Sequence, residues 1–365
     1  MRQTLLWLHR WVALITGLFL VLIALSGCLI SLEGPIDRAL HPALFAVPPA
    51  RGLPALPPDS LVALVSRSLS ATPRSHEGPV VITSFRPPDA DGRPAILVDD
   101  QNVDVYADPY RGTILGVRTP AEDQATFGRW VRNVHERLLT GETGSFVVGV
   151  ITILTLVVVL VGLVLWWRDK GWQVRWTASW KRIVFDLHHL LGIAATPVLV
   201  VMLASAIAIR YDGVRDLIGK LDPAPAPDQL PQSSAPDGTP TITLASVLAT
   251  ANQRMPGARP MVLNIPADPK QPFLVILRYP EDRTPAGRSR ITLDRYTGAV
   301  LLEQSSRTAG LGTKINNLKR SMHTGDLFGT ATDVLWFLAS LALASQAVSG
   351  FLMWWNARGA RAKRS

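Results

Sequence analysis

Cysteine is almost absent from this sequence: Cys28 is the single one among 365 residues, and it lies within an apolar run. One thiol excludes an internal disulfide and any metal site built from several cysteines. The sequence also lacks a glycine-rich dinucleotide fingerprint and a flavin motif, so we do not expect the chain to carry its own nucleotide or flavin cofactor. Seven histidines are left as the main candidate metal ligands.

Long apolar runs, by contrast, are plentiful. Hydrophobic residues make up 48% of the chain and gather in four blocks. Each block holds at least the ~20 mostly apolar residues that cross ~30 Å of hydrocarbon, and a helix satisfies its own backbone there. We therefore predict a membrane α-helical protein whose four transmembrane helices comprise residues 5–32, 145–167, 183–209 and 327–355.

Acidic residues are scarce in the two basic segments of the chain. The loop 168–182 carries five basic residues against Asp169, and the tail 356–365 carries four with no acid. Basic loops stay on the cytoplasmic side, so both segments and the N-terminus are predicted to be cytoplasmic. The segments 33–144 and 210–326 then lie outside. The net charge of +9 follows this pattern and predicts no nucleic-acid partner.

Both outer segments have the pattern of small α+β modules. In each one, a helical stretch precedes strand-like runs that are separated by turns rich in proline and glycine. The helical stretches are 61–69 and 244–252; the strand-like runs are 80–85, 95–98, 103–117, 260–265, 273–279 and 291–302. Between residues 222 and 238 the composition is that of a proline-rich linker.

The chain also contains an internal repeat. His135 precedes Gly162 by 27 residues, and His323 precedes Gly350 by 27 residues as well. The opening Leu8-His9-Arg10 likewise matches Leu187-His188-His189. The sequence therefore predicts two parallel repeats, each consisting of a helix, an outer module and a second helix.

The repeat places four histidines in register at two heights. His9 and His188 lie near the cytoplasmic starts of the first and third helices, while His135 and His323 lie on short amphipathic stretches beside the outer ends of the second and fourth. Two histidines that face each other across a four-helix bundle are the arrangement that holds a b-type haem, with one imidazole nitrogen on each side of the iron. The matched positions predict two b-type haems.

Haem ligation is not the sole role open to these histidines. A single interfacial histidine often serves as an anchor, and His189 is able to replace His188 as a ligand or to contact a haem propionate. Zinc is less favoured, because no carboxylate or thiol lies at ligand spacing beside the histidines. His41 and His76 have no repeat partner and are expected on the surface.

Two further features each have more than one possible role. Basic residues flank the outer histidines, and they attract an anionic chelate, hold haem propionates or anchor the helices: Arg129, Arg132, Arg137, Lys314, Lys319 and Arg320. The stretch Leu25-Ser26-Gly27-Cys28 is similar to a lipoprotein cleavage site. Cleavage there would discard His9, and the apolar run continues through Ile30, so we expect Cys28 to be unmodified.

Several motifs resemble the bacterial PepSY-associated transmembrane helix family over essentially the whole chain. They are the opening Leu8-His9-Arg10-Trp11, the turns at 108–113 and 294–299, and the Trp-Trp pairs at helix ends. Members with this layout include inner-membrane reductases of ferric siderophores that carry two haems. The family's opening motif usually has glycine where this chain has Ala13.

The resemblance implies a di-haem oxidoreductase of the bacterial inner membrane, which moves electrons outward to reduce periplasmic ferric siderophores and release ferrous iron. It implies His9 with His188 as ligands of the cytoplasmic-side haem iron, and His135 with His323 as ligands of the outer one. The electron donor is then quinol or a separate cytoplasmic reductase. The alternative is a non-enzymatic PepSY regulator or sensor of periplasmic proteolysis, in which paired histidines have no purpose.

Overall fold

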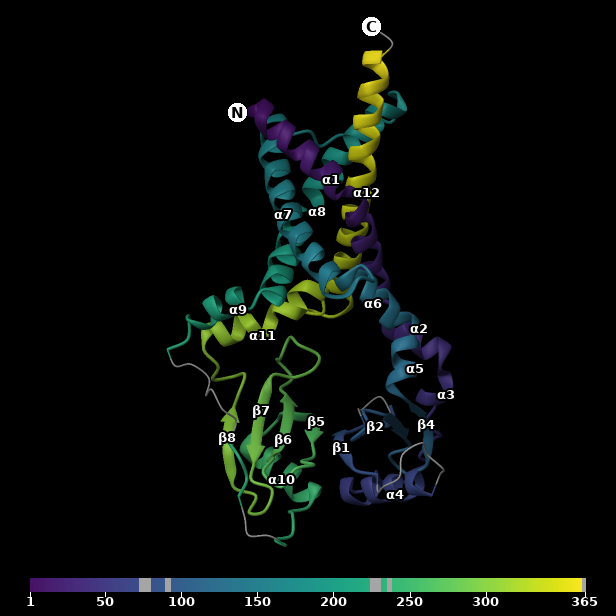
Figure 1. Cartoon of the computed structure of the whole chain (residues 1–365), viewed down its shortest axis with the longest axis vertical. Coiled ribbons are helices and arrows are strands. Elements are labelled where there is room, and N and C mark those ends of the chain that lie inside the picture. Colours follow the sequence, from purple (N-terminus) through teal and green to yellow (C-terminus); the bar gives the residue numbers. More distant parts are fainter. Residues whose placement is uncertain (72–79, 89–92, 224–230, 235–237, 363–365) are drawn as a thin grey trace. The chain divides into compact units, whose positions relative to one another are not determined.

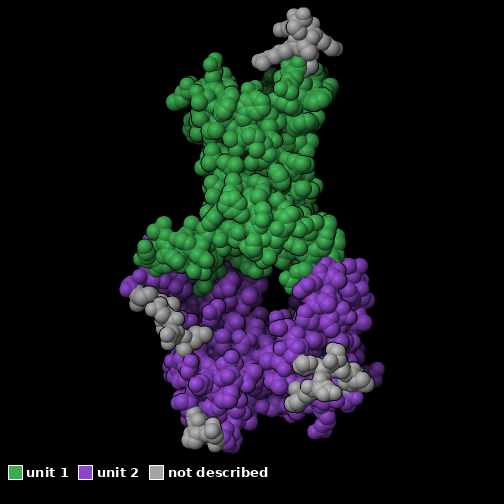
Figure 2. All heavy atoms as spheres, in the orientation of Figure 1, with its two compact units in different colours: residues 1–33, 127–220, 315–365 green, residues 34–126, 221–314 purple. Residues whose placement is uncertain are grey.

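The computed structural model describes all residues except 72–79, 89–92, 224–230, 235–237 and 363–365. His76 and most of the proline-rich segment 222–238 lie outside the described residues. The chain divides into two compact units (Figure 2). The first unit contains residues 1–33, 127–220 and 315–365, and the second contains residues 34–126 and 221–314.

The first unit is a helical bundle. In the described part of the chain, four helices are long and apolar enough to cross a membrane, in agreement with the predicted membrane α-helical class. They are α1 (Arg2–Ser31), α7 (Gly141–Asp169), α8 (Trp180–Arg210) and α12 (Thr330–Ala362). The helix α12 begins three residues later than predicted, because Gly329, whose φ is 74°, forms a turn before it.

The four long helices pack as a ring in which α1 contacts α7 and α12, and α8 contacts the same two (Figure 1). Small side chains such as Ala24, Ala195 and Ala339 are buried between them and allow close approach. Large apolar side chains point outward, for example Leu18 with 71% of its surface exposed. An apolar exterior of this kind suits lipid as the surrounding solvent.

Shorter helices flank one end of this bundle. The helix α6 (Phe127–Arg137) packs on α1 and α7, and α9 (Asp212–Gly219) follows α8 directly. The helix α11 (Leu311–Thr324) precedes α12. The structure thus groups α6 and most of α11 with the long helices rather than with the strands.

The described strands of the second unit form one antiparallel sheet in the order β4-β3-β2-β1-β5-β6-β7-β8. The first half supplies β1 (Ile82–Arg86), β2 (Ala95–Asp99), β3 (Asp104–Ala107) and β4 (Ile114–Arg118). The second half supplies β5 (Arg259–Asn264), β6 (Phe273–Arg278), β7 (Ser289–Leu293) and β8 (Val300–Gln304). The two predicted modules therefore share a sheet.

The junction between the halves is the pairing of β1 with β5, where Ser84 lies opposite Asn264 and Phe85 opposite Leu263. This pairing covers two strand edges that separate modules would leave open. The helices α4 (Pro58–Ser70) and α10 (Leu244–Arg254) contribute to a single apolar core with both half-sheets. The remaining helices of this unit are short: α2 (Glu33–Leu40), α3 (Pro42–Phe45) and α5 (Pro120–Ala125).

Candidate functional site

The bundle brings the four repeat-matched histidines together in two pairs. His9 on α1 faces His188 on α8, with ring centroids 6.4 Å apart. His135 on α6 faces His323 on α11, with ring centroids 6.1 Å apart. A metal–imidazole bond is about 2 Å long, so two imidazoles on opposite sides of one metal ion have centroids roughly 6 Å apart. Both pairs have the separation that a single shared iron requires.

Hydrogen bonds at Nδ1 orient each of these imidazoles. Three Nδ1–H groups donate to a backbone carbonyl of a neighbouring helix: His9 to Val158 (3.0 Å), His135 to Ile23 (2.8 Å) and His323 to Met202 (3.0 Å). A carbonyl oxygen only accepts, so Nδ1 of each ring carries the proton and Nε2 of the neutral ring keeps a lone pair. Metal-bound histidines commonly have their second nitrogen held in this way.

The fourth imidazole uses a side chain instead of a carbonyl. His188 Nδ1 lies 2.8 Å from Ser349 Oγ on α12. His135 has a similar hydroxyl in addition to its carbonyl, because Ser26 Oγ lies 3.2 Å from its Nδ1. The sequence alone did not single out these serines as functional, although the repeated dipeptide Ser-Gly at 26–27 and 349–350 was a usable signal.

Electrostatics keeps the rings of His135 and His323 neutral. Desolvation among the apolar helices, followed by the neighbouring His323, lowers the pKa of His135 to about 4. Desolvation also lowers the pKa of His323. Both rings are therefore uncharged near pH 7, which is the protonation state in which imidazole donates a lone pair to a metal.

Glycines make room for two of the rings. A Cβ on Gly162 would lie 3.1 Å from His9 Cε1, and a Cβ on Gly27 would lie 3.1 Å from His135 Cε1. A Cβ on Gly350 would lie 3.7 Å from His188 Cε1, which is an ordinary van der Waals contact. All four histidines are only partly buried. Neutral, oriented imidazoles with remaining accessible surface are in the form that ligates a haem iron.

The two pairs lie at opposite ends of the bundle. Fourteen residues separate His9 from Ile23, whose carbonyl holds His135, and fourteen separate His188 from Met202, whose carbonyl holds His323. At 1.5 Å per helical residue each interval spans about 21 Å. Together the pairs reach across most of the ~30 Å hydrocarbon layer.

The other histidines lie elsewhere. The ring of His189 packs against Phe185, with centroids 4.2 Å apart, while His188 is the residue that faces His9. His41 is bonded through Nδ1 to Asp37 at 2.9 Å in the second unit. Among the described residues, no group of three or more His, Cys, Asp and Glu is placed to hold a metal ion.

The basic residues beside the outer pair are partly engaged with acids. Arg132 forms ion pairs with Glu33 and Glu136, and Arg137 pairs with Glu142. At the other end of the bundle Arg175 forms a bidentate pair with the buried Asp186, with both bonds at 3.0 Å. This pair folds the loop 168–182 back against the start of α8.

Cys28 lies inside the bundle and not at a free end. Its side chain is buried, and Sγ is 3.7 Å from the carbonyl oxygen of Phe337 on α12. The helix α1 continues past it to Ser31. This placement is that of a packing residue between α1 and α12.

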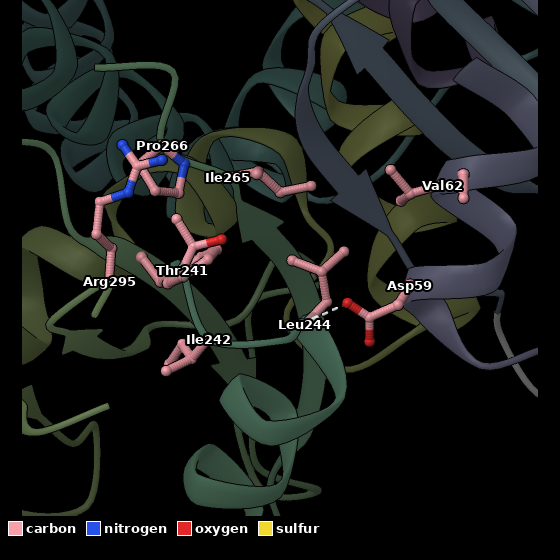
Figure 3. A pocket seen from close by; sticks show the side chains of 10 residues that line it. Asp59, Val62, Thr241, Ile242, Leu244, Ile265, Pro266 and Arg295 are labelled. Atoms are coloured by element: carbon pink, nitrogen blue, oxygen red, sulfur yellow. Dashed lines mark hydrogen bonds between the residues drawn. The ribbon is translucent and has the colours of Figure 1, made fainter. Parts of the chain in front are cut away.

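A hollow of about 250 Å³ lies in the second unit where its two halves meet (Figure 3). Beside it the carboxylate of Asp59 on α4 accepts hydrogen bonds from the N–H groups of Leu244 and Ala245 and so caps α10. The walls of the hollow are mostly apolar, with Thr241 and Arg295 among the polar residues. Pockets for drug-sized ligands measure about 300–1,000 Å³, so this hollow is too small to enclose a chelated metal complex.

The four apolar helices and the eight-stranded sheet define a multi-pass membrane protein with an attached β-rich unit. The family model for the PepSY-associated TM region matches residues 6–357. The chain therefore belongs to this family. A comparison with curated proteins finds no match.

Proposed function

We propose that this protein is a di-haem reductase of the bacterial inner membrane that delivers electrons to ferric siderophores in the periplasm. The observation that carries the proposal is the presence of two facing histidine pairs, one at each end of the bundle, with centroid separations of 6.4 and 6.1 Å. His9 and His188 would hold one haem, and His135 and His323 the other. When bound, each haem supplies an iron that changes between the ferric and ferrous states by one electron.

The side chains of the protein prepare both sites for this chemistry. The Nδ1 hydrogen bonds fix the tautomer in which Nε2 is free to ligate. The separation of about 21 Å between the heights of the two pairs divides the membrane crossing into shorter steps. Ferric ions in chelates are held by hard oxygen ligands, and adding one electron weakens that hold and releases ferrous iron.

The number of electrons transferred sets the stoichiometry between donor and ferric ion. Each ferric ion consumes one electron, whereas oxidation of a quinol releases two electrons and two protons, so one quinol serves two ferric ions. The pair His9 and His188 is the natural entry site, since it lies at the end of the bundle that carries the basic loop. A separate cytoplasmic reductase is the other possible donor.

We further propose that the halves of the chain are parallel repeats. Both half-sheets run outward from the junction in the order of their strands. The carbonyls that hold His135 and His323 belong to Ile23 and Met202, which lie at the same distance from His9 and His188. Matching hydrogen bonds at matching positions support a duplicated ancestor.

Orientation is open to a direct test. Both termini are expected in the cytoplasm, with residues 33–144 and 210–326 in the periplasm, because the loop 168–182 and the tail 356–365 are strongly basic. Reporter domains inserted at Gly171 and Gly238 should give opposite signals: cytoplasmic at Gly171 and periplasmic at Gly238. Equal signals from the two positions contradict this topology.

The reductase activity is tested with chemically reduced protein under anaerobic conditions. Ferric hydroxamate chelates are expected to reoxidise the haems, as seen in the visible spectrum, and to yield ferrous iron that a ferrous-specific dye traps. The matched control is the gallium(III) complex of the same chelator, which has the same charge and a similar shape but accepts no electron. If the protein stays reduced with every ferric chelate but is reoxidised by another periplasmic acceptor, the siderophore assignment is wrong.

A further inference from the structure

Two Ser-Gly dipeptides lie against one histidine of each pair. On α12, Ser349 Oγ is 2.8 Å from His188 Nδ1, and a Cβ on Gly350 would lie 3.7 Å from the same ring. On α1, Ser26 Oγ is 3.2 Å from His135 Nδ1, and a Cβ on Gly27 would lie 3.1 Å from that ring. Each dipeptide thus offers a hydroxyl to the ring nitrogen and bare backbone to the ring carbon.

The direction of the hydrogen bonds follows from the serine protons. Ser349 Oγ donates to the carbonyl oxygen of Ser345 at 2.7 Å, so its one proton is used within its own helix. Ser26 Oγ donates in the same way to Leu22 at 2.7 Å. Each hydroxyl oxygen therefore accepts the Nδ1–H of its histidine. Because Nδ1 then carries the ring proton, the lone pair of Nε2 stays available for the metal.

The two histidines differ in whether a second hydrogen bond holds Nδ1. His135 also donates to the carbonyl of Ile23 at 2.8 Å, which is shorter than its contact with Ser26. For His188, Ser349 supplies the hydrogen bond that backbone carbonyls supply to the other three rings. Loss of the Ser349 hydroxyl would leave the His188 N–H to find a new partner among apolar helices, which is unfavourable.

We propose that Ser349 is the positioning residue for His188, which it holds in the tautomer and orientation that direct Nε2 toward His9. Ser26 has the same relation to His135, but the carbonyl of Ile23 is a second acceptor for the same Nδ1–H. This inference rests on the proposed function, since it assigns these serines to the haem sites. Ser349 and Ser26 act through the histidines and do not themselves contact the iron.

The expected effects differ between the two serines. Removing an outer partner of a metal-bound histidine weakens the metal site roughly 10- to 100-fold. Ser349→Ala is therefore expected to release the inner haem to an excess of an apo haem-binding protein roughly 10- to 100-fold faster, with release of the outer haem unchanged. Ser26→Ala is expected to change release of the outer haem only slightly, because Ile23 still accepts the Nδ1–H.

The reduction potential gives a second measurement that does not depend on activity. An acceptor at Nδ1 makes the imidazole a stronger donor and favours ferric iron, so Ser349→Ala should shift the potential of the inner haem upward. Ser349→Thr keeps the hydroxyl and should restore both the release rate and the potential. The matched control is Ser345→Ala, which removes a hydroxyl one turn away that donates to Ala342 in its own helix.

The outcomes separate this inference from the proposed function. Rapid loss of the inner haem in Ser349→Ala, with wild-type behaviour in Ser349→Thr and Ser345→Ala, supports it. If Ser349→Ala does not fold, the test uses Ser349→Thr, which must release both haems at the wild-type rate. A wild type with two haems and a Ser349→Ala variant indistinguishable from Ser345→Ala overturn the inference alone. A wild type that binds no haem overturns the proposed function and the inference together.

Discussion

Replacement of His323 by alanine is expected to lower the haem-to-protein ratio from two to one. His323 lies 6.1 Å from His135 between ring centroids, so its removal takes away one of the two axial ligands of the outer haem. The pair His9 and His188 lies about 21 Å away along the bundle and is expected to keep its haem. His135→Ala should give the same ratio, whereas His9→Ala and His188→Ala should each remove the inner haem.

Two other histidines serve as controls for this prediction. His41→Ala removes a ring that is bonded to Asp37 in the second unit, so its haem ratio should stay at the wild-type value. His189→Ala tests the neighbouring register, since its ring packs on Phe185 and His188 is the one that faces His9. Haem loss in His189→Ala together with a normal haem-to-protein ratio in His188→Ala would assign the inner ligand to His189 instead of His188. Four pair variants with unchanged ratios contradict the ligand assignment altogether.

The second large effect concerns the direction of electron flow. In detergent, chemically reduced His323→Ala is expected to reduce ferric hydroxamate no faster than protein-free buffer, although it still carries the inner haem. The reason is distance, because the inner pair lies about 21 Å from the level of the outer pair. Reoxidation of this variant at the wild-type rate would show that substrate reaches the inner site.

The inner variant should behave differently in the same assay. His9→Ala keeps the outer pair, so after chemical reduction it is expected to pass one electron to the chelate at the wild-type rate. In sealed vesicles with the reductant confined to the cytoplasmic side, however, the same variant should transfer none. This contrast between His9→Ala and His323→Ala arises only if electrons pass the two pairs in series.

Much of the bundle could be predicted from the sequence. The apolar runs located the four spans. The interval of 27 residues selected His135 and His323, and the match of Leu8-His9-Arg10 with Leu187-His188-His189 selected His9 and His188. Both features are local or periodic, so they are visible without knowledge of the fold. Membership of the PepSY-associated family, inferred from motifs, is confirmed by the match over residues 6–357.

The shared sheet could not be predicted in the same way. Its central contact joins Phe85 to Leu263, which are far apart in the sequence, and no turn fixes the register between them. Strand pairing of this kind depends on how two separately formed half-sheets meet. The sequence pattern therefore located the strands but did not show that the two modules make one sheet.

The supporting residues of the histidine sites could not be predicted either. The contact between Ser349 and His188 depends on how α12 is rotated against α8, which the apolar pattern of α12 does not set. The sequence predicts only that Arg175 marks the cytoplasmic side, yet in the structure it binds the buried carboxylate of Asp186. Such pairings require the three-dimensional arrangement of helices and loops.

The most direct measurement is the haem content of the full-length wild-type protein, purified from cells supplied with haem, with haem and protein quantified on the same sample. We expect two b-type haems per chain, both low-spin with two imidazole ligands in the visible and electron paramagnetic resonance spectra. The double variant His9→Ala with His323→Ala, which disrupts both pairs, should contain none. A wild type without haem, or a double variant with as much haem as the wild type, would contradict the assignment of the two pairs as haem sites.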